Sequence, residues 1–213
     1  MKTDKILKCE NLSYNIGYRK ILKDIRFEIF TSDCISLMGD NGSGKSTLLR
    51  ILANHSKFEK SIFWQTSSKR KFPISYLGHE LGLYSSLSLK ENLDYFLKIL
   101  DNRVEKKRLD YVLEIFRLEK RLYDPIHTFS RGMKQKAALM RALLVESRLL
   151  LLDEPFSGLD SKSSHFLVEL LKNFVKCDSM VIITHNLDIL SELTNKHFFL
   201  KGGKLAITQS PNS

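Results

Sequence analysis

The chain of 213 residues contains no run of the about 20 apolar residues that a membrane-spanning helix requires. Its N-terminus, MKTDKILKCENL, lacks the apolar core of a secretory signal peptide. Cysteine is scarce, with only Cys9, Cys34 and Cys177 in the chain. These three are odd in number, far apart and outside any metal-ligand spacing. These absences predict a cytosolic protein with free, buried thiols in a reducing compartment, so that work at a membrane requires another chain.

Acidic residues are in deficit, because 24 Asp and Glu face 34 Lys and Arg and leave a formal net charge of +10. A basic surface attracts nucleic acid, anionic lipid or only solvent. The basic residues lie in short groups spread along the chain, such as 69–71 and 106–108, which favours solvated faces over one binding patch. Without an internal repeat or a low-complexity linker, we expect one domain over residues 1–213 and no nucleic-acid partner.

The pattern of apolar residues predicts an α/β fold. Near the N-terminus it indicates three short strands, then a glycine turn and a helix. The strands are Ile6–Cys9, Ile25–Ile29 and Cys34–Met38, and the helix is Ser46–Ala53.

Towards the C-terminus, Leu149–Leu152 and Met180–Thr184 are apolar throughout or nearly so, as strands covered on both faces require. A helix predicted over His165–Val175 lies between them, and such a crossover is typical of a parallel sheet. A hairpin then turns at Gly202 and Gly203.

Residues 85–147 are predicted to be a helical block between these two regions. Ser88 and Glu91 have the spacing of a capping box, in which each side chain bonds the other residue's backbone amide. Two amphipathic helices follow, the second over Val104–Leu118. Their apolar faces comprise Leu93, Phe96, Leu97 and Leu100, then Leu109, Val112, Leu113 and Phe116.

The stretch GDNGSGKST matches G-x-x-x-x-G-K-[ST], and it follows a buried strand and opens a helix. It comprises Gly39, Asp40, Asn41, Gly42, Ser43, Gly44, Lys45, Ser46 and Thr47. Glycines let successive backbone amides point at phosphate oxygens, and the helix N-terminus adds its dipole. We expect Lys45 to reach the β- and γ-phosphates of a nucleoside triphosphate and Ser46 to bind Mg²⁺.

Two further stretches narrow the chemistry. LLLLDEP places Asp153 and Glu154 at the carboxyl end of a buried strand, where ligands of such sheets bind. Asp153 is then positioned to hold Mg²⁺, and Glu154 to polarise the attacking water. FSRGM places Ser130 as the N-cap of a helix whose apolar face includes Met133, Ala137, Met140 and Leu144.

Together with SGLD ending at Asp160 and IITH ending at His185, these stretches resemble the ATP-binding-cassette ATPases in order and spacing over nearly the whole chain. The resemblance implies that family's fold: a mainly parallel core sheet, an N-terminal antiparallel region and an inserted helical subdomain, here about 85–147. It also implies a head-to-tail dimer, most simply a homodimer, that shares ATP and Mg²⁺. One subunit would offer the phosphate loop, Asp153, Glu154 and His185, and the other Ser130 and Gly132, with Asp160 linking the two sites.

Three positions depart from the family pattern. Arg131 replaces a glycine of the family's signature motif, which is FSRGM in this chain, and we expect its side chain to point to solvent. Ile16 holds the place of the aromatic residue on which adenine stacks, with Tyr14 and Tyr18 as alternatives or as plain strand side chains. His79 replaces the glutamine that touches Mg²⁺ and water. It either takes part at that site or is an ordinary loop histidine.

The stretch around His79, with SIFW before it, resembles the ATP-binding subunit of the haem exporter of cytochrome c maturation. The leading hypothesis is therefore an ATPase, peripheral on the inner face of the cell membrane, that drives a separate membrane-spanning subunit through the loop 79–89. The alternatives are the ATPase of another exporter, a soluble cassette ATPase in cofactor assembly, and a nucleotide-binding regulator without turnover. The presence of Glu154 and His185 argues against the last.

Overall fold

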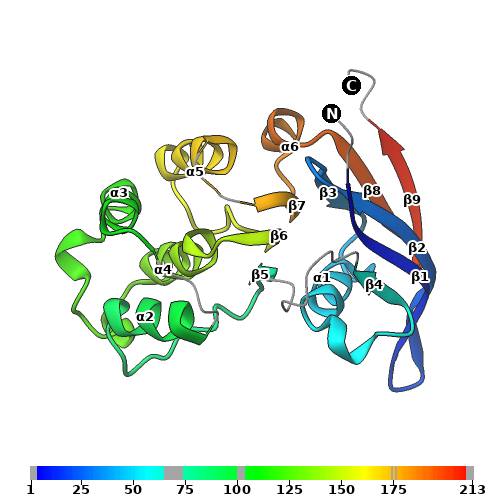
Figure 1. The fold of residues 1–213 in the computed structure, drawn as a ribbon, viewed down its shortest axis with the longest axis horizontal. Helices are drawn as coiled ribbons and strands as arrows, with labels where there is room; N and C mark the ends of the chain where they lie inside the picture. The colour runs from blue at the N-terminus through cyan, green and yellow to red at the C-terminus, as the bar shows by residue number, and fades with distance from the viewer. Residues whose placement is uncertain (1–3, 65–73, 100–103, 174, 176, 210–213) are drawn as a thin grey trace.

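The computed structural model describes residues 4–64, 74–99, 104–173, 175 and 177–209 (Figure 1). A small antiparallel sheet has the strand order β2-β1-β4, with β1 at Lys5–Ile16, β2 at Arg19–Phe30 and β4 at Ile62–Trp64. The first two strands extend well beyond the predicted Ile6–Cys9 and Ile25–Ile29. Their pairing contains several register shifts, and such bulges break the alternation of apolar residues by which a strand is recognised.

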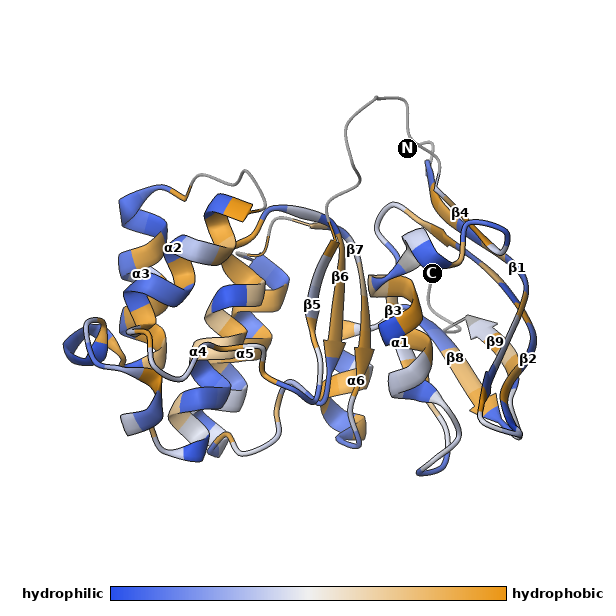
Figure 2. Ribbon diagram, turned by 90° about the horizontal axis from the view of Figure 1, so that it is seen from below, coloured by the Kyte–Doolittle hydropathy of each residue, from blue (hydrophilic) through white to orange (hydrophobic). Residues whose placement is uncertain are grey.

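The larger sheet has the order β5-β6-β7-β3-β8-β9 and is parallel except for the last pair. Its strands are β3 at Cys34–Met38, β5 at Ile74–Leu77, β6 at Ser147–Asp153, β7 at Cys177–Ile183, β8 at Lys196–Lys201 and β9 at Lys204–Gln209. Leu149 to Leu152 of β6 are fully buried, and Figure 2 shows the apolar character of β6 and β7. The predicted mainly parallel core sheet with an N-terminal antiparallel region is confirmed.

Six α-helices surround these sheets in the described part of the chain. They are α1 at Lys45–Ala53, α2 at Leu89–Ile99, α3 at Lys106–Phe116, α4 at Arg131–Leu144, α5 at Ser161–Asn173 and α6 at Leu187–Leu193. In Figure 1, α2, α3 and α4 gather at the end of the molecule away from β1 and β2. Within the described residues, no helix combines the length and apolar character that a membrane crossing needs.

Several local predictions hold, whereas two helices differ from their predicted ranges at both ends. The capping box forms, because Ser88 N donates to Glu91 Oε2 at 2.8 Å and Glu91 N to Ser88 Oγ at 3.2 Å. The helix predicted over Val104–Leu118 is shorter, since Arg117 adopts a left-handed conformation with φ 56° and ends α3. The helix predicted from His165 begins earlier, at Ser161.

The predicted apolar faces of α2 and α3 contribute to the core, and the predicted free thiols are found. Leu93 of α2 and Val112, Leu113 and Phe116 of α3 are buried in one core, whereas Leu100 lies outside the described residues. All three cysteines are free; Cys9 is buried, and the other two are half-buried instead of buried as predicted.

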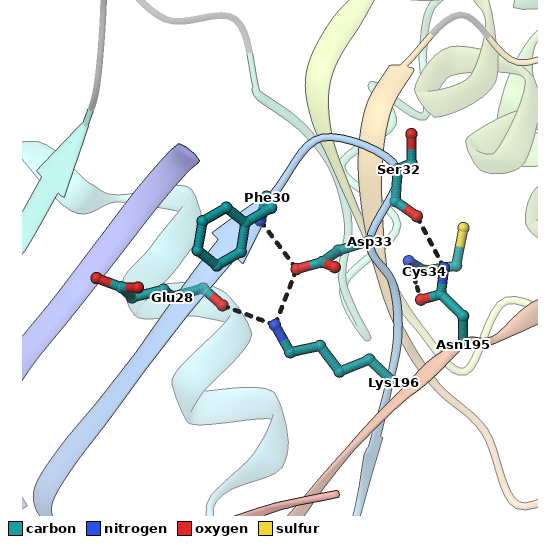
Figure 3. Close-up of polar contacts among 7 residues, drawn as sticks. All are labelled: Glu28, Phe30, Ser32, Asp33, Cys34, Asn195 and Lys196. Atoms are coloured by element: carbon teal, nitrogen blue, oxygen red, sulfur yellow. Dashed lines mark hydrogen bonds and ion pairs between the residues drawn. The ribbon is translucent and has the colours of Figure 1, made fainter. Parts of the chain in front are cut away.

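A polar contact fastens the start of β8 to the turn between β2 and β3 (Figure 3). Lys196 Nζ donates to Asp33 Oδ2 at 3.0 Å and to the backbone oxygen of Glu28 at 3.1 Å. Asp33 Oδ2 also accepts from the backbone amide of Phe30 at 2.9 Å. The two charged side chains are only 11% and 17% exposed. Because both are largely shielded from water, removing one leaves the other charge poorly compensated.

We therefore expect Lys196→Met to lower the free energy of unfolding by about 2 kcal/mol, because the Asp33 carboxylate loses its partner while the aliphatic stem is kept. Urea unfolding followed by circular dichroism measures the change. Lys204→Met is the matched control, because Lys204 is exposed on β9, and it should stay within about 0.5 kcal/mol of the original protein. Equal stabilities of the two variants would contradict a role for the Lys196 contact.

Candidate active site

The phosphate-binding motif forms a loop between the carboxyl end of β3 and the start of α1. Gly39, Gly42 and Gly44 have φ values of 142°, 76° and 107°, a region that favours glycine. Lys45 is buried, and its Nζ donates to the backbone oxygens of Gly39 at 2.8 Å and Asp40 at 3.0 Å. The loop therefore curls around the lysine ammonium, at the N-terminus of a helix whose dipole favours an anion.

The carboxyl end of β6 supplies two acidic residues. Asp153 is buried, and its Oδ2 has no hydrogen-bond partner within the described residues. Glu154 follows at a sharp turn with φ 51°, and its backbone amide donates to Ile183 of β7 at 2.9 Å. A non-glycine residue in this conformation is strained, and such strain is concentrated at functional sites. The strand end thus fixes both carboxylates next to the phosphate loop.

The carboxyl end of β7 brings His185 to the same place. Its Nε2 lies 3.4 Å from Glu154 Oε1, and the imidazole is largely exposed. Burial raises the pKa of Glu154, and the neighbouring charge of Asp153 adds to this, whereas His185 and Lys45 oppose it. A carboxylate with a raised pKa is a stronger base, which suits it to accept a proton.

These strand ends enclose one cleft of about 260 Å³. Its lining comprises Ile21, Asn41, Gly42, Gly44, Lys45, Ser46, Thr47, His79, Asp153, Glu154, Ile183 and His185. The structure therefore brings together the predicted phosphate loop, both carboxylates and both histidines. His79, for which the sequence left an ordinary loop position open, lies in the cleft just beyond β5. Ile21 was not predicted, because no motif marks it, whereas Ile183 lies within the IITH stretch but was given no role of its own.

Ser130, Gly132 and Asp160, which were predicted to act across a dimer interface, do not line this cleft. Ser130 caps α4 by accepting from Met133 N at 3.2 Å, as predicted, and Arg131 is exposed. Gly132 faces the turn before α5, where an added Cβ would lie 3.3 Å from the backbone oxygen of Gly158. The signature stretch and the SGLD turn therefore lie side by side on the same chain, apart from the phosphate loop.

Asp160 is the N-terminal cap of α5. It accepts from Ser163 N at 2.8 Å and from Ser163 Oγ at 3.0 Å, and these bonds lower the pKa of its carboxyl. Asp160 was predicted to link the two sites of a dimer, and no cap was predicted for it. The cap explains why α5 starts at Ser161 and not at His165.

Neither Tyr14 nor Tyr18, the tyrosines considered for stacking on adenine, belongs to the cleft lining. Tyr14 is half-buried, and its ring meets Phe58 edge-on with centroids 5.9 Å apart. Tyr18 is fully exposed at the β1–β2 hairpin, and Ile16 is 57% exposed. The apolar wall beside Gly44 comes from Ile21, whose Cγ2 would lie 3.0 Å from a Cβ at Gly44. Loop, carboxylates and helix N-terminus are together the arrangement of a P-loop nucleotide-binding protein.

Comparison with known proteins identifies the family. The model of the ABC transporter family matches residues 22–157. The probable sulfate/thiosulfate import ATP-binding protein of Chlorella vulgaris is 34% identical over 206 residues, which cover 92% of this chain and 87% of that one. A cytochrome c biogenesis ATP-binding export protein of Cupriavidus metallidurans is 28% identical over 190 residues, covering 85% and 90%. The chain belongs to the ABC transporter family.

A solved structure shows the same fold. A dimeric ATP-binding cassette in a post-hydrolysis state, bound to ADP and phosphate, has a TM-score of 0.78 to this chain at 23% identity. The similarity covers 96% of this chain and 98% of that one. The predicted fold class is thereby confirmed. The protein is an ATP-binding ATPase of the ABC transporter family, and the alternative of a nucleotide binder without turnover is set aside.

Proposed function

We propose that the chain acts as a single nucleotide-binding unit, 1–213, and hydrolyses ATP to drive a separate membrane-spanning subunit. The observation that carries this proposal is the convergence of four strand ends, those of β3, β5, β6 and β7, on one cleft. Lys45 and the backbone amides of residues 39–47 hold the phosphates. Glu154 accepts a proton from the attacking water, and His185, 3.4 Å from Glu154, orients that water and contacts the γ-phosphate.

The residues of the cleft also fit Mg²⁺. Asp153 Oδ2 is buried and without a hydrogen-bond partner among the described residues, which is costly unless a cation compensates the charge. Ser46 lines the same cleft, and its hydroxyl would supply a second oxygen ligand. Mg²⁺ prefers oxygen ligands and keeps several waters, so one carboxylate, one hydroxyl and the phosphates suffice to hold it. Bound there, Mg²⁺ would neutralise charge on the phosphates.

The location of the signature supports a dimer. Ser130 and Gly132 lie at the exposed N-terminus of α4, outside the cleft of their own chain. In a head-to-tail pair of identical chains, each α4 N-terminus would face the γ-phosphate in the other chain's cleft, where its dipole favours an anion. Asp160 follows the turn that lies against Gly132 and would sit at the same interface.

A second hollow is the proposed contact with the membrane-spanning subunit. It has a volume of about 410 Å³ and lies between β5, α2 and α4. Tyr84, Tyr95 and Ile99 expose apolar surface around it, and the Arg141 guanidinium lies 4.8 Å from the centroid of Phe96. We call this hollow the aromatic groove. Exposed apolar surface next to a cavity is typical of a protein interface.

The groove and the cleft share one wall, the turn Gly78–Glu80. Gly78 and Glu80 line the aromatic groove, whereas His79 between them lines the nucleotide cleft. A helix docked in the groove would therefore press on the backbone that carries His79. We propose that His79 couples the partner to hydrolysis, and that the partner belongs to a haem exporter of cytochrome c maturation, in keeping with the similarity to the Cupriavidus metallidurans protein.

The test is an affinity purification from the native membrane with tagged Glu154→Gln protein and excess ATP. Recovery of a multi-span protein linked to cytochrome c assembly would support the whole proposal. Recovery of another membrane protein would keep the transport function and overturn the haem assignment, and the likeness to an import protein makes this a real outcome. Recovery of soluble proteins alone would favour cofactor assembly and overturn the transport function.

The groove itself is tested by Tyr95→Glu. We expect the substitution to abolish recovery of the membrane subunit, because it places a charge on the apolar docking surface. Tyr123→Glu is the matched control, since Tyr123 is 77% exposed and is not part of the groove lining. It should recover the partner like the original chain. Equal recovery with both variants would contradict docking in the groove.

A further inference from the structure

Tyr76, the third residue of β5, contacts the turn that separates the groove from the cleft. Its side chain is half-buried and forms part of the aromatic groove. Its hydroxyl packs directly against Gly78, because a Cβ added at Gly78 would overlap Tyr76 Oη. The phenol therefore supports the backbone of Gly78, the residue before His79. Because Gly78 has no side chain, it leaves the space that the hydroxyl occupies.

The same residue joins two helices that belong to different parts of the site. The charge of Arg50 in α1, the helix that begins at the phosphate loop, acts on the Tyr76 phenol. The backbone oxygen of Tyr76 accepts from Arg141 Nη2 of α4 at 3.0 Å, and α4 begins at the signature serine. Burial raises the pKa of Tyr76, and the nearby charge of Asp153 adds to this, whereas Arg50 opposes it.

We propose that Tyr76 is a positioning residue that transmits occupation of the aromatic groove to His79 in the nucleotide cleft. The inference deepens the proposed function, on whose assignment of His79 it rests. A partner residue in the groove would contact the ring, and the hydroxyl at the other end of the ring packs against the Gly78 backbone. Packed side chains of this kind pass a displacement on because the interior has little free space.

A double-mutant cycle on the purified full chain tests the link. Tyr76→Phe keeps the ring and removes the hydroxyl, and we expect kcat for ATP hydrolysis to fall about fivefold while the Kd for ATP stays within about twofold. His79→Ala should lower kcat at least as much. If Tyr76 acts through His79, the double variant has the kcat of His79→Ala to within about twofold, because the second change removes nothing further.

Tyr123→Phe, which also deletes one phenolic hydroxyl, is the matched control and should leave kcat unchanged. Gly78→Ala perturbs the same contact from the turn and should reproduce the fall in kcat, which keeps the test open if Tyr76→Phe folds poorly. The inference would be overturned if the double variant lost kcat by the product of the two single-variant factors. A fall in the melting temperature of Tyr76→Phe without a fall in kcat would overturn it as well. Either outcome is distinct from failure of the proposed function, which appears as loss of the membrane partner in the affinity purification.

Discussion

Replacing Glu154 with glutamine is expected to lower kcat for ATP hydrolysis by about 10²–10⁴-fold, the usual contribution of a general base, and to leave ATP binding intact. The amide keeps the size of the side chain but cannot accept the proton of the attacking water. Phosphate release in the steady state measures kcat, and titration with a fluorescent ATP analogue measures the Kd. Asp178→Asn, a change at an exposed carboxylate that pairs with Arg148 on the sheet, is the control for the loss of one negative charge.

The same variant has a predicted stability and pH dependence. Burial raises the pKa of Glu154 in the folded protein, so the folded state disfavours the charged carboxylate and the group costs stability at neutral pH. That cost diminishes as the pH falls towards the pKa of the unfolded chain, because the folded state then binds its proton more readily. Glu154→Gln should therefore melt at or above the temperature of the original nucleotide-free protein at pH 7, and this advantage should shrink at lower pH. A lower melting temperature of the variant at pH 7 would show that the charged Glu154 carboxylate does not destabilise the folded protein. Unchanged turnover would show that Glu154 is not the general base.

Replacing Gly39 with alanine is expected to destabilise the fold by about 3–5 kcal/mol, because two costs add. The residue has φ 142°, and its added Cβ would overlap the backbone oxygen of Leu200 in β8. That backbone cannot move aside, since β8 is paired with β3 on one side and with β9 on the other.

The control for this change is Gly42→Ala, which also has a positive φ, 76°, but open space around the added methyl group. It should cost about 1–2 kcal/mol from backbone strain alone. Urea unfolding of both variants gives the two free energies. Similar losses for Gly39→Ala and Gly42→Ala would mean that the close approach of Leu200 contributes nothing.

The site was predictable where its residues follow one another along the chain. The spacing from Gly39 to Thr47 and the position of Asp153 and Glu154 after four buried leucines are local patterns, and the parallel sheet explains why their strand ends meet. The cap of α5 also has a local pattern, the capping spacing of Asp160 and Ser163, although the predicted start at His165 missed it.

Other features depend on contacts between distant segments and leave no local pattern. The contact of Arg141 with the backbone of Tyr76 joins residues 65 positions apart, and neither residue type indicates the other. The extension of β1 and β2 beyond their apolar alternation follows from bulges that only the pairing of the two strands reveals. The entry of His79 into the cleft depends likewise on how β5 lies against β6.

The order of the core strands has a consequence for synthesis on the ribosome. β3, which carries the phosphate loop, lies between β7 and β8, whose residues are made about 140 and about 160 positions later. While those segments are still inside the ribosome, β3 has no neighbours in its sheet, and the backbone of Leu200 is not yet present behind Gly39. A nascent chain thus carries the whole motif GDNGSGKST long before it can grip a triphosphate. Nucleotide can therefore stabilise the completed fold but cannot guide its early stages.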